Sequence, residues 1–452
     1  MILLVSFLVI LSVCYHVSKT IVLTPQFCFT LCFLPGIIYA FFYIDTWNIN
    51  FSPLTLFILI GGTAVFSVVS ITTSHILSRC STKRGSIILI PGIDTTPINH
   101  KQYKIKPSLL LLICYTIVQL FTIYMLYRYI MSLSGRGSIS DAIYYFRHER
   151  VFSNRDIDVP GYLGFLKYFC YSSGYLISYI LIHSLVYRYK CWQPLLIFNI
   201  AISLGTDLLF GARTGSMQML VAIALQFYIV FGKKYGWKIK LDRRIVLVAL
   251  IAVVALVISF KSVGNLLGRG TERETDEYLS VYISAELKNL DIFVRNGKFG
   301  AGFSECQTMI YVVNYMGAKL GHPEWIHGLD LPFRSVNGHT LGNVYTIFYA
   351  FLYDGGILGV LFYSALMAVL CQIAFHLSLK ERDNSKVDIW VVIYSYFGCA
   401  LVFSFFSNTF YELVFNNGFI KFLTFWMILK LAIDHLHFRA PDLHIPKIKI
   451  SL

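Results

Sequence analysis

The 452-residue sequence predicts an all-α membrane protein with one large, partly helical loop outside the membrane. Three observations lead to this fold class. Hydrophobic residues make up 56% of the chain and charged residues only 14%, whereas a soluble globular protein carries about 25% charged residues. Mean hydropathy is +0.65. The sequence also contains 37 Phe and 30 Tyr, as expected where aromatic rings anchor helices at membrane interfaces.

The apolar residues gather in long runs, and about 20 of them in a helix are enough to cross a bilayer. The first run lacks the basic start and the small-residue cleavage site of a signal peptide, so we interpret it as a retained span. About eleven spans are expected by the length rule. In chain order they are 2–16, 20–43, 54–78, 107–131, 160–187, 194–209, 216–232, 245–261, 356–379, 389–407 and 418–436.

The distribution of Lys and Arg predicts the orientation of these spans. Basic residues collect in the loops after the third, seventh, ninth and eleventh spans, at 79–106, 233–244, 380–386 and 439–449. All four loops fall on one side, which the positive-inside rule makes cytoplasmic. The N-terminus is then outside and the C-terminus inside. The same loops account for the net charge of +14, so the charge does not indicate a nucleic-acid partner.

The predicted organisation has three parts: spans one to eight at 1–261, a large outward loop at 262–355, and spans nine to eleven with a basic tail at 356–452. Apolar residues at helical spacing within the loop predict three amphipathic helices. These are Asp276–Arg295, Ser304–Lys319 and Leu341–Tyr353.

The sequence predicts neither a metal site nor a cofactor. It has no Cys-x-x-Cys pair of the kind that binds zinc, and no glycine-rich Walker motif for a nucleotide. Asp156 and Asp158 form an Asp-x-Asp pair, but Val159-Pro160 follows directly, which favours a turn. Cys306 is the single cysteine of the large loop, so we expect a free thiol there.

Arg213 is the first candidate for chemistry. It lies in the short turn Phe210-Gly-Ala-Arg-Thr-Gly215 between the sixth and seventh spans. A charge at a membrane edge is costly and therefore often functional. An arginine beside a helix start can bind an anion such as a pyrophosphate. The alternative is an arginine that reaches for the interface and anchors the helix end.

Four further arginines lie in outward segments and could join Arg213 in a cationic basin for a lipid pyrophosphate. Each by itself is more simply a solvated loop charge. They are Arg147, Arg150, Arg295 and Arg334.

His339 is the candidate general base, because an imidazole titrates near neutral pH and can accept a hydroxyl proton. Asn343 follows four residues later, which would place both on one face of the third amphipathic helix, with Tyr345 close by. The alternative role of His339 is a helix cap. His322 and His327 are rival bases in the same loop.

Several of these motifs together resemble the Wzy-type O-antigen and polysaccharide repeat-unit polymerases. The Gly-Ala-Arg213 turn resembles the Gly-x-Arg turn of that family, and Asp354-Gly-Gly-Ile-Leu-Gly resembles its Asp-x-Gly-x-x-Gly entry after the large loop. Val159-Pro-Gly-Tyr-Leu-Gly resembles the start of a middle span of the family. One dominant loop late in the chain fits the same topology, which is similar to that of lipid-linked glycosyltransferases and O-antigen ligases.

The resemblance implies a glycosyltransferase of the bacterial inner membrane, with its active site facing the periplasm and with no metal or nucleotide. A growing glycan on undecaprenyl pyrophosphate would pass en bloc to a hydroxyl of a new lipid-linked repeat unit. Arg213 would stabilise the leaving pyrophosphate, and His339 would act as the base. The implied partners are these two lipid-linked glycans, the bilayer and a chain-length regulator.

Two other functions stay open on the sequence. An O-antigen ligase would use the same donor with a lipid A core acceptor. A flippase or transporter of lipid-linked oligosaccharide should carry charged or polar groups along several spans; Asp207 is the main acidic residue in a predicted span.

Overall fold

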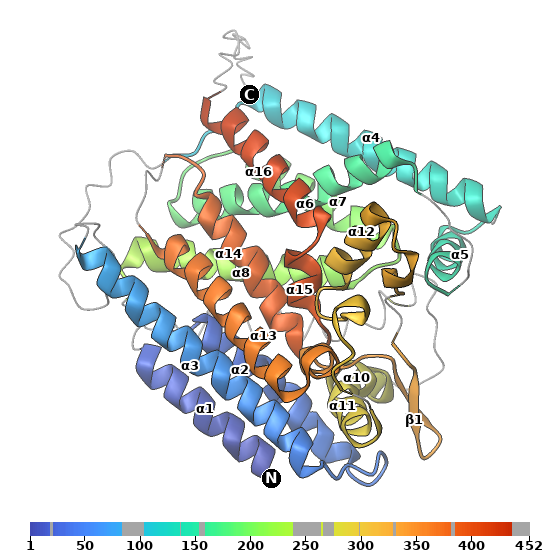
Figure 1. Cartoon of the computed structure of the whole chain (residues 1–452). Coiled ribbons are helices and arrows are strands. Elements are labelled where there is room, and N and C mark those ends of the chain that lie inside the picture. Colours follow the sequence, from blue (N-terminus) through green and yellow to red (C-terminus); the bar gives the residue numbers. More distant parts are fainter. Residues whose placement is uncertain are drawn as a thin grey trace, which may run out of the picture.

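The computed structural model of the protein describes residues 1–18, 21–83, 104–135, 137–152, 159–237, 264, 275–297, 299–328, 331–380 and 385–435. Nearly all of the regular structure in these segments is helical (Figure 1). The part of the chain that the structure describes is therefore all-α apart from one small hairpin. Its first half forms the helices α1 (Ile2–Ser18), α2 (Pro25–Ala40), α3 (Pro53–Lys83), α4 (Leu109–Ser134), α5 (Ile139–Phe152), α6 (Gly161–Val186), α7 (Gln193–Leu208) and α8 (Thr214–Tyr235), with the 3₁₀ turn η1 (Phe41–Tyr43).

The second half contains the elements of the large loop and the last long helices. The loop elements are α10 (Thr275–Ile283), α11 (Ala285–Asn296), η2 (Phe303–Glu305), α12 (Ile310–Leu320), η3 (Pro323–Trp325), β1 (Arg334–Val336) and β2 (His339–Gly342). The last helices are α13 (Ile347–Leu379), α14 (Ile389–Val402), η4 (Phe403–Phe405), α15 (Thr409–Val414) and α16 (Asn417–His435).

Helices occupy most of the predicted spans, but α13 begins at Ile347, well before the predicted start at 356, and α16 at the eleventh predicted span is not among the helices that could cross a membrane. Among the described residues, six helices are long and apolar enough to cross a membrane, and three more apolar helices are shorter. The six comprise α2 with η1, α3, α4, α6, α8 and α13, and the shorter ones are α1, α7 and α14 with η4. The predicted span at 245–261 lies outside the described residues. The chain is thus a multi-pass membrane protein by the length and composition of its helices.

The long helices pack into one body around a continuous apolar core. α3 and α13 lie side by side along its lower left in Figure 1, while α6 packs on α7, α8 and α16. Polar side chains also bond between helices. Gln119 of α4 donates to Ser203 of α7 at 2.9 Å, and Gln226 of α8 donates to Ser395 of α14 at 3.0 Å. Such bonds join helices in a membrane, where apolar burial alone gives no preference for helix over lipid.

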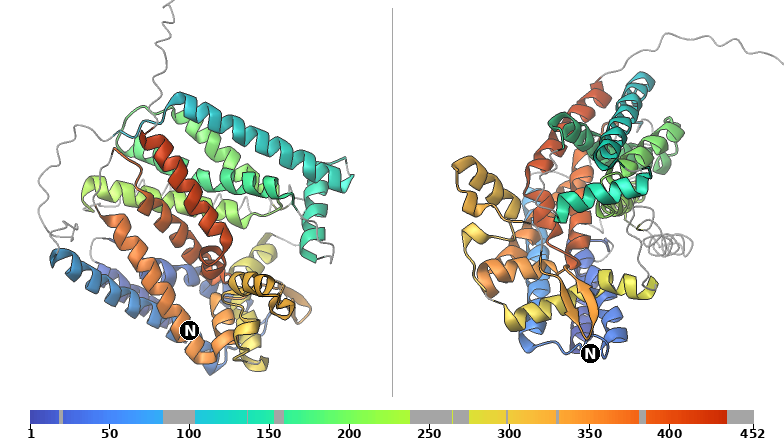
Figure 2. Two further views of the ribbon diagram at one scale, coloured as in Figure 1. Left: turned by 45° about the horizontal axis from the view of Figure 1, so that its top comes forward. Right: turned by 90° about the vertical axis from the view of Figure 1, so that its right-hand side faces the viewer.

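The connections that the sequence placed on one side of the membrane meet in space. Asp291 of α11 accepts hydrogen bonds from the Ser52 amide, before α3, and from the Thr55 hydroxyl, both at 2.7 Å. Asn408, before α15, donates to the carbonyl of Thr308 at 2.8 Å. Two further views place α10, α11, α12 and the hairpin together along one side of the helical body (Figure 2). This side also carries the turn between α7 and α8.

The prediction of a third amphipathic helix, at Leu341–Tyr353, is wrong for its first part. Residues 334–342 form an antiparallel hairpin in which Val336 pairs with His339, and helix begins only at Ile347. The cause is Asn337-Gly338: both have positive φ, 50° and 80°, which is the two-residue turn that closes a hairpin. His339 therefore lies in a strand and Asn343 in the turn after it, so the two do not share a helix face.

The other two predicted helices of the loop exist with different limits. The stretch Asp276–Arg295 forms α10 and α11, which are separated at Ser284. The stretch Ser304–Lys319 is helical from Ile310, after the short turn η2. Cys306 is a free thiol, as expected. It donates to the Asp354 carboxylate at 3.0 Å, and the same carboxylate accepts from the amides of Gln307 and Thr308.

Candidate functional site

The turn between α7 and α8 is held in its shape by two glycines. Gly211 has φ +68°, a conformation that costs other residues strain. A Cβ on Gly215 would lie 2.3 Å from an Asp207 carboxylate oxygen, so glycine is required for the first turn of α8 to approach α7. The backbone thus bends sharply at 210–213 and starts α8 directly after Arg213, which occupies the N-cap position.

A second hydrophobic cluster holds α5 against this turn. It is formed by apolar residues of α4, α5 and α6 with Phe210. The rings of Phe146 and Phe210 meet edge to face at 5.4 Å between centroids. A Cβ on Gly211 would lie 3.1 Å from the side chain of Arg147. The cluster therefore brings Arg147 of α5 next to the turn that carries Arg213.

Arg213 is buried, with 4% of its surface exposed. Its Nη2 donates to the Tyr282 hydroxyl at 3.3 Å, and its guanidinium carbon lies 5.7 Å and 5.5 Å from the ring centroids of Tyr278 and Tyr282. A Cβ on Gly264 would lie 2.6 Å from one of its nitrogens. Two tyrosine rings of α10 and the backbone at 264 thus enclose a charged group, which is costly unless it has a function.

Arg147 adds a second positive charge. Burial lowers its pKa, and the nearby charge of Arg213 lowers it further, against the opposing effect of Tyr282. Arginine stays protonated in proteins, so the two guanidiniums repel one another. Bound anionic oxygens would relieve that repulsion, and the amides at the start of α8 add to the same field. The arrangement is suited to a doubly charged anion.

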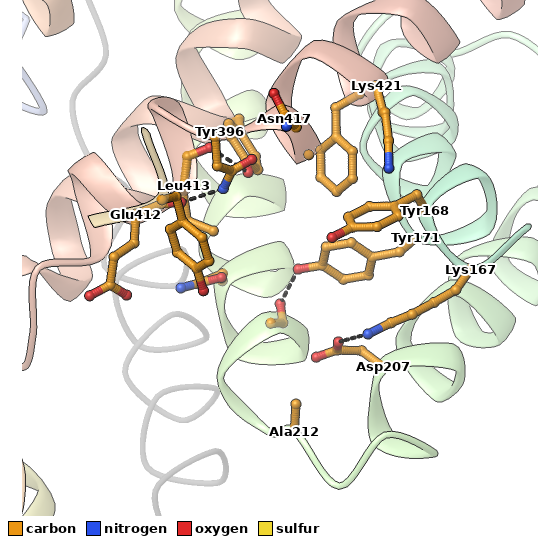
Figure 3. A pocket seen from close by; sticks show the side chains of 16 residues that line it. Lys167, Tyr168, Tyr171, Asp207, Ala212, Tyr396, Glu412, Leu413, Asn417 and Lys421 are labelled. Atoms are coloured by element: carbon orange, nitrogen blue, oxygen red, sulfur yellow. Dashed lines mark hydrogen bonds and ion pairs between the residues drawn. The ribbon is translucent and has the colours of Figure 1, made fainter. Parts of the chain in front are cut away.

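A cavity of about 380 Å³ lies beside the same turn (Figure 3). Ala212 and Gly215 of the turn form part of its wall, and α6, α7, α8, α12, α14, α15 and α16 supply the rest, with Asn416 between the last two helices. Four tyrosines face it, which we name the cavity tyrosines: Tyr168, Tyr171, Tyr311 and Tyr396. The Tyr171 hydroxyl donates to the Gly215 carbonyl at 2.7 Å, which ties α6 to the first turn of α8.

Charged side chains of the cavity lie on opposite sides of it. Figure 3 shows Lys167 and Lys421 on one side and Glu412 on the other. Lys167 is 3.7 Å from Asp207, and the Lys421 ammonium lies 4.9 Å from the centre of the Tyr168 ring. The cavity therefore combines aromatic surfaces with both signs of charge, a lining typical of a site for a polar ligand with apolar faces.

Glu412 was not singled out from the sequence. It lies on α15, the short helix between α14 and α16, where it is half-buried, and its partial burial raises the pKa of its carboxyl to about 7. Among the described residues, its carboxylate makes no hydrogen bond or ion pair. A carboxyl with a raised pKa in a cavity is a candidate general acid or base. Nothing local in Phe410-Tyr-Glu-Leu-Val414 indicates this, because the cavity wall to which Glu412 belongs is completed by α6, α7, α8 and α12, which are distant in the sequence.

The structure brings Arg147 and Arg213 together, whereas two other arginines of the predicted basin have different partners. Arg295 donates to Asp291 at 2.9 Å. Arg334 donates to the Tyr345 hydroxyl at 3.0 Å, and that hydroxyl donates to the Pro332 carbonyl at 2.9 Å. Tyr345 is buried and supports the hairpin. The side chain of Arg150 and the pair Asp156 and Asp158 lie outside the described residues.

The predicted histidines lie on the large loop and not in the cavity wall. His339 is half-buried in β2. His322 bonds Glu324 at 2.8 Å and stacks on Trp325. His327 bonds the Ser304 carbonyl at 2.8 Å. The two rivals of His339 are thus engaged in holding the loop together. No group of three or more potential metal ligands occurs among the described residues.

Comparison with known proteins gives no relative. No family model matches the chain, and neither a curated protein nor a solved structure matches it significantly. The resemblance to repeat-unit polymerases therefore rests on the motifs at 159–164, 211–213 and 354–359 and on the predicted topology.

Proposed function

We propose that the chain is a polysaccharide repeat-unit polymerase, a membrane glycosyltransferase that extends a glycan carried on undecaprenyl pyrophosphate. The observation that carries the proposal is the buried Arg213 at the start of α8, with Arg147 beside it and the cavity on the other side of the turn. The proposed reaction needs two adjacent sites, a positively charged one for the pyrophosphate leaving group and a cavity for the acceptor sugar.

In the proposed reaction, a hydroxyl of the new lipid-linked repeat unit attacks the anomeric carbon of the growing glycan. The bond from that carbon to the pyrophosphate breaks, and undecaprenyl pyrophosphate leaves with the electron pair. Arg213 and Arg147 stabilise the negative charge that develops on the leaving oxygen, which is the largest contribution in many such reactions. The hydroxyl also needs a proton acceptor, for which His339 and Glu412 are the candidates.

The proposed site faces the periplasm of a bacterial inner membrane. Support comes from the basic loops, which fall opposite to the connections around Arg213. A reporter that is active only in the periplasm should therefore work when fused after Gly300 and fail after Lys238. The reverse pattern would place the site in the cytoplasm, where the proposed donor is not polymerised.

Deletion of the gene is the direct test of the activity. We expect the deletion strain to make lipopolysaccharide with core plus one repeat unit, and the wild-type gene to restore long chains. Bare core in the deletion strain would instead identify a ligase. Loss of all periplasmic repeat units, with lipid-linked units accumulating in the cytoplasm, would identify a flippase. A plasmid carrying Glu324→Gln, an exposed position on the loop, is a matched control for expression.

A further inference from the structure

The cavity tyrosines give the cavity a lining suited to a sugar ring. Tyr168, Tyr171 and Tyr396 come from α6 and α14 and surround Phe422 of α16, with ring centroids 5.5 to 5.9 Å from it. A sugar has C–H faces that pack on aromatic rings and hydroxyl edges that need polar partners. Gln218, Asn417 and the two lysines supply such partners in the same wall.

Glu412 lines this cavity from a short helix that is anchored at both ends. Asn408 occupies the N-cap position of α15, where its carbonyl accepts from the Glu412 amide at 3.1 Å, and its side chain donates to the carbonyls of Gln307 and Thr308. Asn416, after α15, accepts from the Phe419 amide at 2.8 Å and so starts α16. Both ends of the helix are therefore fixed, so the backbone that carries Glu412 is held in position, as the support of a proton acceptor must be.

We propose that this cavity binds the acceptor sugar of the new repeat unit and that Glu412 accepts the proton of its attacking hydroxyl. The inference rests on the proposed function and names the acceptor site and the base within it. The O–H bond of the sugar breaks and its proton passes to the carboxylate. The oxygen forms the new bond to the anomeric carbon, and the pyrophosphate departs toward Arg213. The protonated Glu412 then releases its proton to water, which restores the site.

The geometry favours Glu412 over the other ionisable groups of the cavity. Asp207 faces Lys167 at 3.7 Å, so a carboxylate there is already paired with a charge. Lys167, Lys421 and the cavity tyrosines are proton donors in their ordinary states. Glu412, with a pKa near 7, is partly ionised at neutral pH and can both take up and release a proton.

The first test measures polymer formation by membranes that contain the full-length protein, with lipid-linked repeat units extracted from the deletion strain. Glu412→Gln keeps the shape of the side chain but cannot accept the proton, and we expect a loss of about 100-fold or more. Wild-type activity should rise as the pH increases through about 7, because the ionised carboxylate is the active form. Glu412→Asp should keep a fraction of the rate and the same direction of pH dependence. Glu324→Gln is the matched carboxylate control and should be unchanged.

The second test does not depend on activity. A hydrophobic carbodiimide adds to a protonated carboxyl and leaves a stable N-acylurea, which peptide mass spectrometry locates. Modification of Glu412 in the purified protein should fall as the pH rises from about 6 to about 8, and lipid-linked repeat units should protect it. Tyr168→Ala should raise the KM for these units and weaken the protection of Glu412. Tyr168→Phe should leave the KM and the protection at their wild-type levels.

The outcomes separate the two proposals. If the wild-type membranes make no polymer from the extracted units, the proposed function itself fails. If the wild type is active and Glu412→Gln polymerises at the same rate, Glu412 is not the base. If the units give no protection and Tyr168→Ala leaves KM unchanged, the cavity is not the acceptor site. Folding of each variant is checked by its elution from a sizing column in detergent.

Discussion

The α7–α8 turn and the β1–β2 hairpin are two short connections that each place an arginine against a tyrosine hydroxyl. Arg334 is half-buried, and the hydroxyl that it bonds also donates to the Pro332 carbonyl, so the contact closes a loop. Arg213 is 4% exposed, is enclosed by two rings, and lies beside a second guanidinium and a helix start. The arginine–tyrosine hydrogen bond therefore stabilises the loop at the hairpin. At the α7–α8 turn, the similar bond belongs to a region where positive charge is concentrated.

The difference comes from what the rest of the fold adds to each connection. At the turn, Phe210 joins the second hydrophobic cluster, which delivers Arg147 from α5, and α6 brings a cavity wall to the other side. The hairpin packs on α10 and α11 through its second strand. An arginine on which several elements of the fold converge is therefore the better candidate for a functional role. The following substitutions test this comparison.

Arg213→Ala should have the largest effect of the arginine substitutions. Losing a charge that stabilises the leaving group should lower the polymerisation rate by about 100-fold or more, with unchanged protein level in the membrane. Arg213→Lys keeps the charge but loses the planar fork, so partial activity is expected. Arg334→Ala is the matched control and should cost less than about threefold, since it removes a single hydrogen bond. Equal activity of Arg213→Ala and Arg334→Ala would remove the distinction between the two connections.

Arg147→Ala should have an intermediate effect. It removes the second guanidinium while Arg213 and the helix start remain, so we expect a loss of about 10-fold, which corresponds to roughly 1.4 kcal/mol. His148→Ala on the same helix is the control, because that side chain is 50% exposed. Polymer length on gels and the rate in membranes measure both. If His148→Ala lowers activity as much as Arg147→Ala does, the effect comes from disturbing helix α5 and the positive charge of Arg147 is not needed.

Gly215→Ala tests the close approach of α8 to α7. The new methyl group would meet the Asp207 carboxylate at 2.3 Å, and such overpacking typically costs about 1–3 kcal/mol. We expect a lower thermal midpoint and a several-fold loss of activity as the turn shifts. Gly161→Ala, at the start of α6, has no atom within 4 Å of the added Cβ and should be tolerated. A tolerated Gly215→Ala would show that the turn is free to move.

The helices could be predicted from the sequence, because an apolar segment in a membrane must form all of its backbone hydrogen bonds within itself. Arg213 could be proposed as a candidate from the sequence alone, since the cost of a charge at a membrane edge depends on the local sequence. Glu412 could not, because helices far apart in the chain complete the cavity wall to which it belongs, and burial in the folded protein raises its pKa to about 7. The hairpin was missed although Asn337-Gly338 is a strong turn signal. The apolar residues at 341, 344, 345, 348 and 352 have helical spacing, and this pattern was extended across residues that pair as a strand.

Replacement of His339 should have the smallest effect and tests the hairpin directly. The residue lies in β2, which pairs with β1 at Val336, and it is not in the wall of the cavity. His339→Ala and His339→Asn should therefore both keep activity within about twofold, and neither should change the pH dependence set by the base. A helix-capping role would make Asn better than Ala, by about 1 kcal/mol of stability, but a strand position gives no such difference. If both variants lose about 100-fold while the protein still elutes as a folded species, His339 is the proton acceptor. The acceptor hydroxyl would then lie at the hairpin, and the cavity beside α15 would have another ligand.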